Sequence, residues 1–241
     1  YPTSATVPAN LLRLYVEFSG AMSVRGGGEH VRLLDEDNQV VAAPFLPLDL
    51  ALWNEDRTRY TLLFEPGRVK RGILPNREVG PALVEGQTYT LVFDRGWLDE
   101  AGMPLKQEFT RPLTVGAPQH HAIDPTRWGI SPPPAGTRDP LEVSLPSSLD
   151  YGLLQRALRI VNAGGVGLTG AVAIGEAETV WTFTPAMPWA SEEHMLVALP
   201  TLEDPAGNRI GRAFEVATSE RLGPGDRHTG ARIPFYPTLS R

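Results

Sequence analysis

Two stretches of the sequence match each other at one constant spacing. Residues 86–109 align with residues 191–214 at an offset of 105. The pairs at this offset are Tyr89 with His194, Leu91 with Leu196, Ala101 with Ala206, Gly102 with Gly207 and Phe109 with Phe214. An earlier block, residues 62–66, matches residues 181–185 at a larger offset of 119. Such a repeat predicts two similar domains in tandem, and 241 residues are enough for each domain to bury its own core.

The first copy alternates apolar and polar residues with the period of two that is typical of half-buried strands. The strands predicted on this basis are residues 12–18, 31–33, 40–41, 60–64, 88–93 and 109–115. Turn-forming residues separate these strands, for example at 35–38 and 99–102. Six or seven short strands in about 115 residues are typical of a β-sandwich.

The second copy repeats this pattern. Its predicted elements are strands at 141–145, 158–161, 171–174, 181–183, 195–199 and 214–216, and a short helix within 151–157. The matching blocks are 119 residues apart early in the copies and 105 apart later, so the first copy carries an insertion of 14 residues. The predicted boundaries are a first domain at 1–116 with its insertion at 68–81, a connector at 117–130, a second domain at 131–217 and a C-terminal tail at 218–241.

Composition excludes several classes of function. The net charge is −6, and the basic residues are scattered rather than clustered, which argues against nucleic-acid binding. No apolar run approaches the roughly 20 residues needed to cross a bilayer. Cysteine is absent, so disulfides, thiolate catalysis and cysteine-containing zinc sites are excluded. The chain begins at Tyr1 rather than Met, which fits a mature exported product, although a trimmed chain would look the same.

Several short motifs recur in the same order in both copies. They are FSGAMS or LPSSLD after the first strand, TLLFEPG or WTFTPA, GQTYTLVF, and LDEAG or LEDPAGN. This order resembles the bacterial Ig-like module of S-layer and other surface proteins, over residues 5–115 and 125–217. The resemblance implies an all-β fold of two tandem Ig-like β-sandwich domains with a Pro-rich connector and an extended C-terminal tail. It also implies a spacer, adhesive or assembly role without enzymatic activity.

In that family the Asp-x-x-Gly-Asn turn and a Tyr-containing strand are fold determinants. Residues 204–208 keep the turn motif in full, whereas residues 99–103 lose its final Asn. His194 stands in the second copy where the first has Tyr89. The resemblance therefore leaves the packing around His194 open.

The sequence predicts no catalytic centre, no metal and no cofactor. His120 and His121 with Asp124 lack the spacing of metal ligands, so a solvated or hydrogen-bonding His pair is the better interpretation. The acidic turn at 35–38 lacks the spaced oxygen ligands of a calcium loop. Residues 19–23 lack the Gly-x-Ser-x-Gly spacing of a nucleophile elbow. A structural metal and a calcium ion remain as alternatives to these interpretations.

Tryptophans suggest a further alternative. Four of them fall near predicted turns: Trp53, Trp97, Trp128 and Trp189. Exposed indole rings stack on sugars, which gives a carbohydrate-binding hypothesis. Trp is also enriched at protein interfaces, and Trp128 in the connector is placed to wedge between the two domains.

Two segments outside the repeat are the predicted partner-binding sites. The tail shows no strand alternation and has one apolar cluster, formed by Ile233, Pro234, Phe235, Tyr236 and Pro237. A Gly- and Pro-rich terminal segment is ordered only when something holds it, either the protein's own domains or a partner. The insertion supplies the second predicted contact surface, formed by Arg68, Lys70, Arg71, Ile73 and Leu74.

These observations predict a noncatalytic exported protein at the periplasm or cell surface. It would act as an accessory or scaffold subunit that docks through its loops and tail onto protein partners in a larger assembly. Membrane association through such a partner is left open. The alternatives are a carbohydrate-binding or adhesive module and an inert spacer, and the spacer predicts a tail packed only on its own domain.

Overall fold

The computed structural model describes residues 1–24, 27–47, 52–69, 80–214 and 230–239. The chain forms two compact units, one of Thr3–Gln119 with Tyr1 and the other of His120–Arg241 with Pro2. The division falls inside residues 117–130, so the predicted connector is shared between the two units. Among the described residues, no helix is long and apolar enough to cross a membrane.

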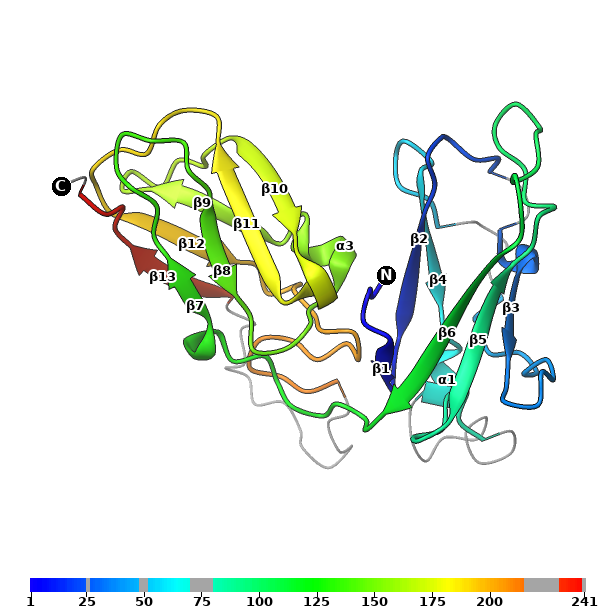
Figure 1. The fold of residues 1–241 in the computed structure, drawn as a ribbon. Helices are drawn as coiled ribbons and strands as arrows, with labels where there is room; N and C mark the ends of the chain where they lie inside the picture. Colours follow the sequence, from blue (N-terminus) through cyan, green and yellow to red (C-terminus); the bar gives the residue numbers. More distant parts are fainter. Residues whose placement is uncertain (25–26, 48–51, 70–79, 215–229, 240–241) are drawn as a thin grey trace. The chain divides into compact units, whose positions relative to one another are not determined.

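The first unit is a β-sandwich of short strands (Figure 1). Its strands are β1 (Thr6–Pro8), β2 (Arg13–Glu17), β3 (Val31–Leu34), β4 (Arg59–Leu63), β5 (Thr88–Phe93) and β6 (Phe109–Gly116), with the short helices η1 (Gly28–His30) and α1 (Pro66–Val69). One sheet has the order β1-β6-β5-β3, and the other pairs β2 with β4. The period of two puts one face of each strand into the core, where Leu14, Leu33, Leu62, Leu91 and Leu113 are buried.

The second unit is also a β-sandwich. Its strands are β7 (Gly129–Ser131), β8 (Leu141–Ser144), β9 (Leu158–Asn162), β10 (Gly170–Ile174), β11 (Val180–Pro185), β12 (His194–Ala198) and β13 (Ala231–Phe235). Its short helices are η2 (Pro125–Arg127), α3 (Tyr151–Leu154) and η3 (Glu176–Glu178). The sheets have the orders β10-β11-β8-β7 and β13-β12-β9, with antiparallel pairing throughout. Antiparallel sheets of four and three strands in this connectivity are those of a constant-type immunoglobulin sandwich.

The leading segment of each domain changes from one sheet to the other. In the first domain, the backbone N–H of Tyr15 in β2 donates to the carbonyl of Tyr1, whereas β1 runs parallel to β6 in the opposite sheet. In the second domain, β7 pairs with β8, and Pro134 then forms a parallel bridge with Thr238 beyond β13. Both domains therefore share this feature of Ig-like sandwiches, and the protein is an all-β chain of two Ig-like domains.

Tyr89 forms the tyrosine corner that is typical of Ig-like domains. It lies at the start of β5, where its hydroxyl accepts a hydrogen bond from the Val84 N–H (3.2 Å) and donates one to the Gln87 side chain (2.9 Å). Burial is the largest cause of the raised pKa of this phenol. Its hydrogen bonds fix the chain that enters β5.

His194 takes the corresponding position in the second domain and is buried. Its Nδ1 lies 2.9 Å from the carbonyl oxygen of Glu192, and because a carbonyl only accepts, Nδ1 carries the proton. The ring stacks on Phe235 and meets Trp189 edge-on, with centroid distances of 5.6 and 5.3 Å. A hydrogen bond to the residue two positions earlier is kept, but to its backbone carbonyl instead of its side chain, and aromatic packing surrounds the His194 ring.

The last strand of the second domain differs from the prediction. A final strand was predicted at 214–216, but Phe214 lies in a bend where its N–H donates to Asn208 Oδ1 (2.8 Å), and residue 216 lies outside the described residues. The sheet is completed instead by β13, whose residues pair with β12 from His194↔Phe235 to Ala198↔Ala231. This part of the tail is therefore a strand of the second sandwich rather than a segment beyond it.

The Asp-x-x-Gly-Asn turn is a buried hydrogen-bonded unit in the second domain. Asp204 Oδ1 accepts from the N–H groups of Ala206 and Asn208, both at 2.9 Å, and Asp204 Oδ2 accepts from the Asn208 amide (2.8 Å). The first-domain turn keeps the equivalent bonds of Asp99 to Ala101 and Met103 but is exposed. The final Asn208 therefore adds a hydrogen bond from its amide to Asp204 Oδ2, which gives this oxygen a partner inside the buried turn.

Burial, outweighing these hydrogen bonds, raises the pKa of Asp204 above its ordinary 3.8. As pH rises from 3.8, the Asp204 carboxyl group loses its proton in the unfolded chain before it does so in the folded chain, whose Asp204 pKa is higher. The second domain should therefore lose about 1.4 kcal/mol of stability for each unit by which the pKa is raised. Asp204→Asn cannot titrate, so its Tm should rise relative to wild type across this pH window.

The measurement is the thermal unfolding of both chains, followed by fluorescence between pH 3.5 and 7. Because the Asn208 amide loses its acceptor in the variant, a pH-independent difference in Tm is also expected. Two Tm profiles that stay parallel across the window would contradict the prediction.

Candidate docking surfaces

The five predicted tail residues divide between the core and the surface. Phe235 and Pro237 are buried and Ile233 packs against the core, whereas Pro234 and Tyr236 are exposed. The Tyr236 hydroxyl donates to Glu193 (2.9 Å), and this hydrogen bond is the largest cause of the raised pKa of the phenol. Residues 233–237 of the tail are therefore held by the protein's own second domain, and Tyr236 is the accessible aromatic group among them.

Gly230 explains how the tail enters the sheet. A Cβ at this position would overlap the backbone carbonyl of Ala198, the last residue of β12. Backbone cannot yield as a flexible side chain does, so the chain passes this point only as glycine. The close approach sets the start of β13.

One of the five residues predicted to form the insertion surface, Arg68, is buried. Its guanidinium donates to the carbonyls of Ala42, Ala43, Gly80 and Pro81; the last three distances are 3.2, 3.0 and 3.0 Å. Desolvation is the largest cause of its lowered pKa. Arg68 therefore ties the ends of the insertion to the first domain and is not a docking residue. The other four predicted residues, Lys70, Arg71, Ile73 and Leu74, lie outside the described residues.

The tryptophans do not offer the exposed rings that the carbohydrate hypothesis needs. Trp97, Trp128 and Trp189 are buried, and Trp53 is half-buried. Trp97 meets Phe18, Tyr60 and Trp53 edge-on at centroid distances of 5.0, 5.2 and 5.9 Å. In the second domain, the Trp189 indole N–H donates to the carbonyl of Asp139 (2.8 Å). These rings pack in the two cores. The expectation that they are exposed and available to stack on sugars is therefore wrong.

The polar groups considered as metal ligands have structural partners. Asp124 caps η2 by accepting from the N–H and hydroxyl of Thr126 at 3.0 and 2.6 Å, and these bonds lower its pKa. Asp35 accepts from the N–H groups of Asp37 (3.1 Å) and Gln39 (2.8 Å), which makes the acidic hairpin a side-chain-stabilised turn. Within the described ranges, no group of three or more His, Asp or Glu side chains is placed to hold a metal ion.

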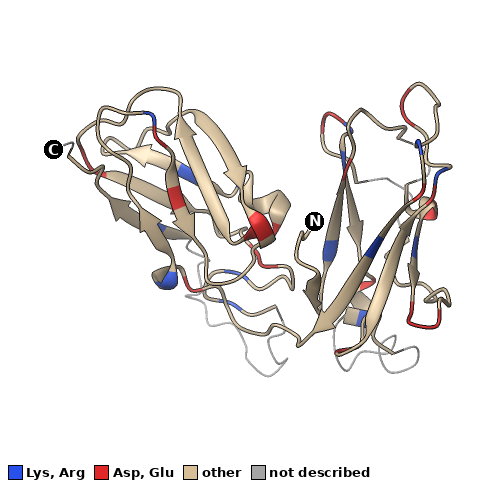
Figure 2. Cartoon of the chain, in the orientation of Figure 1, with Lys and Arg blue, Asp and Glu red and all other residues tan. Residues whose placement is uncertain are grey.

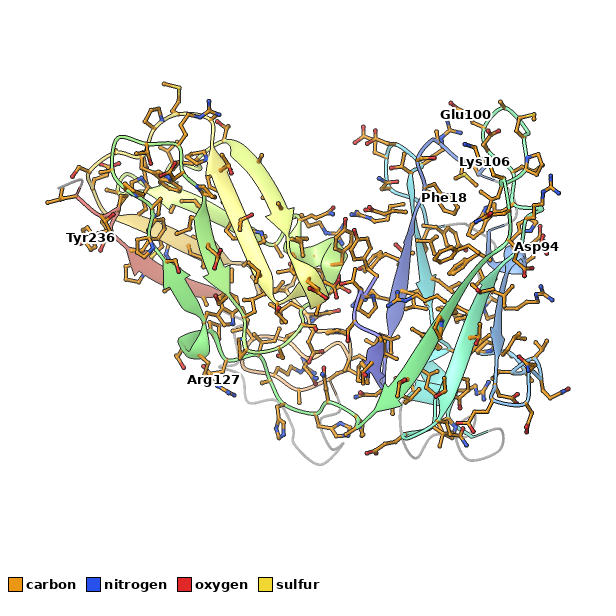
Figure 3. All side chains as sticks on the ribbon, in the orientation of Figure 1. Phe18, Asp94, Glu100, Lys106, Arg127 and Tyr236 are labelled. Carbon is orange, nitrogen blue, oxygen red and sulfur yellow. The ribbon has the colours of Figure 1, made fainter. Side chains whose placement is uncertain are left out.

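Exposed apolar side chains gather at one end of the first domain. Register places the end of β2 beside the start of β4, and the end of β5 beside the starts of β3 and β6. The exposed residues in the loops and strand starts at this end are Val24, Leu52, Leu98, Met103 and Phe109, called here the first apolar end. Figure 3 shows Phe18, Glu100 and Lys106 in the same region, and Glu100 pairs with Arg57 at 2.6 Å.

The second domain has a similar surface at the end where β11 leads to β12. The end of β9, the start of β12 and the end of β13 lie together by register. The exposed residues there are Val166 (64%), Met187 (74%), Tyr236 (62%) and Leu239 (77%), called here the second apolar end. In Figure 3, Tyr236 lies at the opposite end of this domain from Arg127 of η2.

Both apolar ends lie away from the segment that joins the two domains. The chain leaves the first domain after Gly116 at the far end of β6, where the Asn10 side chain holds the backbone of Gln119 through bonds of 2.7 and 2.9 Å. It enters the second domain through Ile123, which forms a bridge with Ile210 in the loop after β12. Among the described residues, most of the large exposed apolar side chains of each domain thus lie at its end opposite the junction.

No protein-family model matches the sequence, and no curated protein matches it. Among solved structures, the chain is similar to a chimeric titin Z1Z2 functionalized with a KLER exogenous peptide from decorin. The sequence identity is 10%, the match covers 96% of this chain and 98% of that chain, and the TM-score is 0.25. The assignment of the Ig-like fold rests on the strand order and register of each domain.

Proposed function

We propose that this chain is a noncatalytic scaffold subunit that joins protein partners through the two apolar ends. The observation that carries the proposal is the position of the exposed apolar side chains, which gather on each domain at the end opposite the junction. Burying a large apolar side chain contributes about 1.5–3 kcal/mol to association, so a cluster of them is an energetic basis for docking. Rigid sandwiches hold such side chains on loops of fixed geometry.

The sequence motifs supply the setting of the proposal. Their order resembles bacterial Ig-like modules of S-layer and other surface proteins, whose role is spacing, adhesion or assembly. We infer an exported protein that acts in the periplasm or at the cell surface, with any membrane contact made through its partner. The proposed docking residues differ from those expected from the sequence, because Phe235 packs in the second core and the Arg68 guanidinium is buried among backbone carbonyls, while Tyr236 remains on the surface.

The proposal is tested by adding a charge at each apolar end. Met103→Glu and Met187→Glu should each lower the retention of a specific partner from an envelope extract at least about tenfold, because each loss exceeds about 1.4 kcal/mol. Val40→Glu is the matched control, since Val40 is 61% exposed, close to the 62% of Met103, but lies at the other end of the first domain. Retention is measured by quantitative mass spectrometry on immobilised chains.

Equal retention by wild type, both Met variants and the control would contradict the proposal. An inert spacer is the second candidate, and a specific observation favours it: Ile233, Phe235 and Pro237 pack onto their own domain, as the spacer hypothesis predicts. A spacer would show no partner whose retention depends on either apolar end.

A further inference from the structure

Strand β10 leaves the outer edge of the four-stranded sheet of the second domain open. Hydrogen bonds just outside the strand fix which groups point outward: Gly175 N–H donates to Val180 (2.8 Å) and Ala186 N–H donates to Thr169 (2.9 Å). In an antiparallel pair the bonded residues alternate, so Ala171 and Ala173 bond to β11. The N–H and C=O groups of Gly170, Val172 and Ile174 therefore point away from the sheet. We describe this set as the open edge.

The other edges of the second domain are protected. By the same alternation, the residues of β13 whose backbone groups point outward are Arg232 and Pro234. A charged side chain and a proline, which has no N–H to donate, both hinder pairing with a further strand. The outer edge of β9 is bonded to the following loop, with Asn162 N–H donating to Val166 (3.0 Å) and Leu168 N–H donating to Ile160 (2.8 Å). Strand β7 has three residues and runs directly into prolines 132–134. Only β10 among the described edges of this domain carries none of these features.

The chemistry of β10 also favours pairing. No ionisable side chain occurs from Ile160 to Gly175, and Figure 2 shows the whole of β10 without a charged residue. Gly170, Val172 and Ile174 register with Pro185, Phe183 and Trp181, so they continue the apolar face, while Ala171 and Ala173 lie on the opposite face. Val172 and its neighbours on β10 are exposed at this edge. An exposed uncharged strand of this kind is a template for another strand.

The geometry points to a second copy of this chain as the partner of the open edge. The three outward residues are symmetric about Val172, so a two-fold axis at Val172 lets the two strands satisfy each other in antiparallel pairing. Gly170 of each copy then lies opposite Ile174 of the other.

The contact between two copies adds no local charge repulsion. Each chain carries a net charge of −6, which opposes association of two copies in general, and the uncharged strand β10 keeps like charges out of the contact itself. In the two-fold register, Glu176 lies opposite Leu168 of the second copy, and no like charges face each other across the pair. The result is a continuous eight-stranded sheet that buries Val172 of both copies.

The test is sedimentation velocity of the intact chain at concentrations up to about 100 µM, over which a micromolar dimer is populated. Wild type should form a dimer. Val172→Pro removes the central outward N–H without removing a bond to β11, and should raise the dimer dissociation constant at least about tenfold. Arg232→Pro is the matched control, because it removes an outward N–H from β13, an edge strand of the other sheet of the same domain, and should leave the dimer intact.

A second variant, Ala173→Lys, tests the same contact without a proline, in case Val172→Pro fails to fold. Ala173→Lys puts a charge on the face opposite the core, and it should weaken the dimer most at low salt while retaining the wild-type near-UV circular dichroism. A wild-type chain that stays monomeric overturns the inference. Dimerisation that neither Val172→Pro nor Ala173→Lys weakens overturns it too, as does a loss of dimer in Arg232→Pro.

Discussion

Phe235→Ala should destabilise the second domain by about 3–5 kcal/mol. Phe235 is 5% exposed, and its ring packs against Trp189 and His194 at centroid distances of 5.8 and 5.6 Å. Truncation removes the aromatic anchor of β13 and leaves a cavity beside two other rings. The measurement is the free energy of unfolding of the second domain in urea, followed by tryptophan fluorescence.

Tyr236→Ala is the matched control for this change. Its ring is exposed, and its one hydrogen bond in the described structure is to Glu193 on the surface, so its effect should stay within about 0.5 kcal/mol. The reverse ranking of the two variants would mean that β13 does not belong to the second core. If Phe235→Ala left stability unchanged but abolished partner binding, the sequence-based view of the tail as a docking element would be restored.

Arg68→Ala should destabilise the first domain by about 3 kcal/mol or more, because hydrogen bonds to charged groups each contribute roughly 1.5–3 kcal/mol. Its guanidinium donates to four backbone carbonyls, from Ala42 and Ala43 on one side and Gly80 and Pro81 on the other. The substitution to Ala removes the guanidinium and leaves the four carbonyl oxygens without this hydrogen-bond donor. Arg68→Lys should recover part of the loss, since an ammonium lacks the planar fork that reaches both sides.

The control for Arg68 is an arginine in an exposed pair. Arg32 lies 3.4 Å from Glu108 with both side chains about half exposed, so Arg32→Ala should cost less than about 1 kcal/mol. Chemical denaturation of the first domain measures both variants. Equal effects of the two substitutions would show that Arg68 does not fasten the ends of the insertion.

Sequence periodicity located most strands because strand burial is a local property. Residues 88–93 were predicted as a strand and form β5, and the alternation around Leu14 and around Leu141 marks β2 and β8. Each of these strands has its core residues two apart, so the pattern is readable without knowing the partner strand. The turn at Asp204 was equally visible, because its hydrogen bonds lie within five residues.

The candidate docking residues were less predictable, because exposure depends on contacts distant in sequence. Arg68 reads as a surface cation, yet carbonyls 25 and 26 residues earlier and 12 and 13 residues later enclose it. Trp97 and Trp189 lie beside turns, but rings from other strands cover them. Met187, the most exposed residue of the second apolar end apart from Leu239, carries no sequence signal that separates it from a core methionine.

The sequence by itself determined that this protein is a tandem of two β-sandwich domains, since the repeat and the period-two alternation are properties of the chain alone. Only the tertiary structure decided which segment closes the second sheet. The repeat continues to Phe214, but the partner that β12 accepts is β13, which carries Pro234 within it and follows Gly230. The physical reason is that a strand edge is satisfied by whichever segment presents matching hydrogen bonds and apolar side chains, and distance along the sequence does not specify that choice.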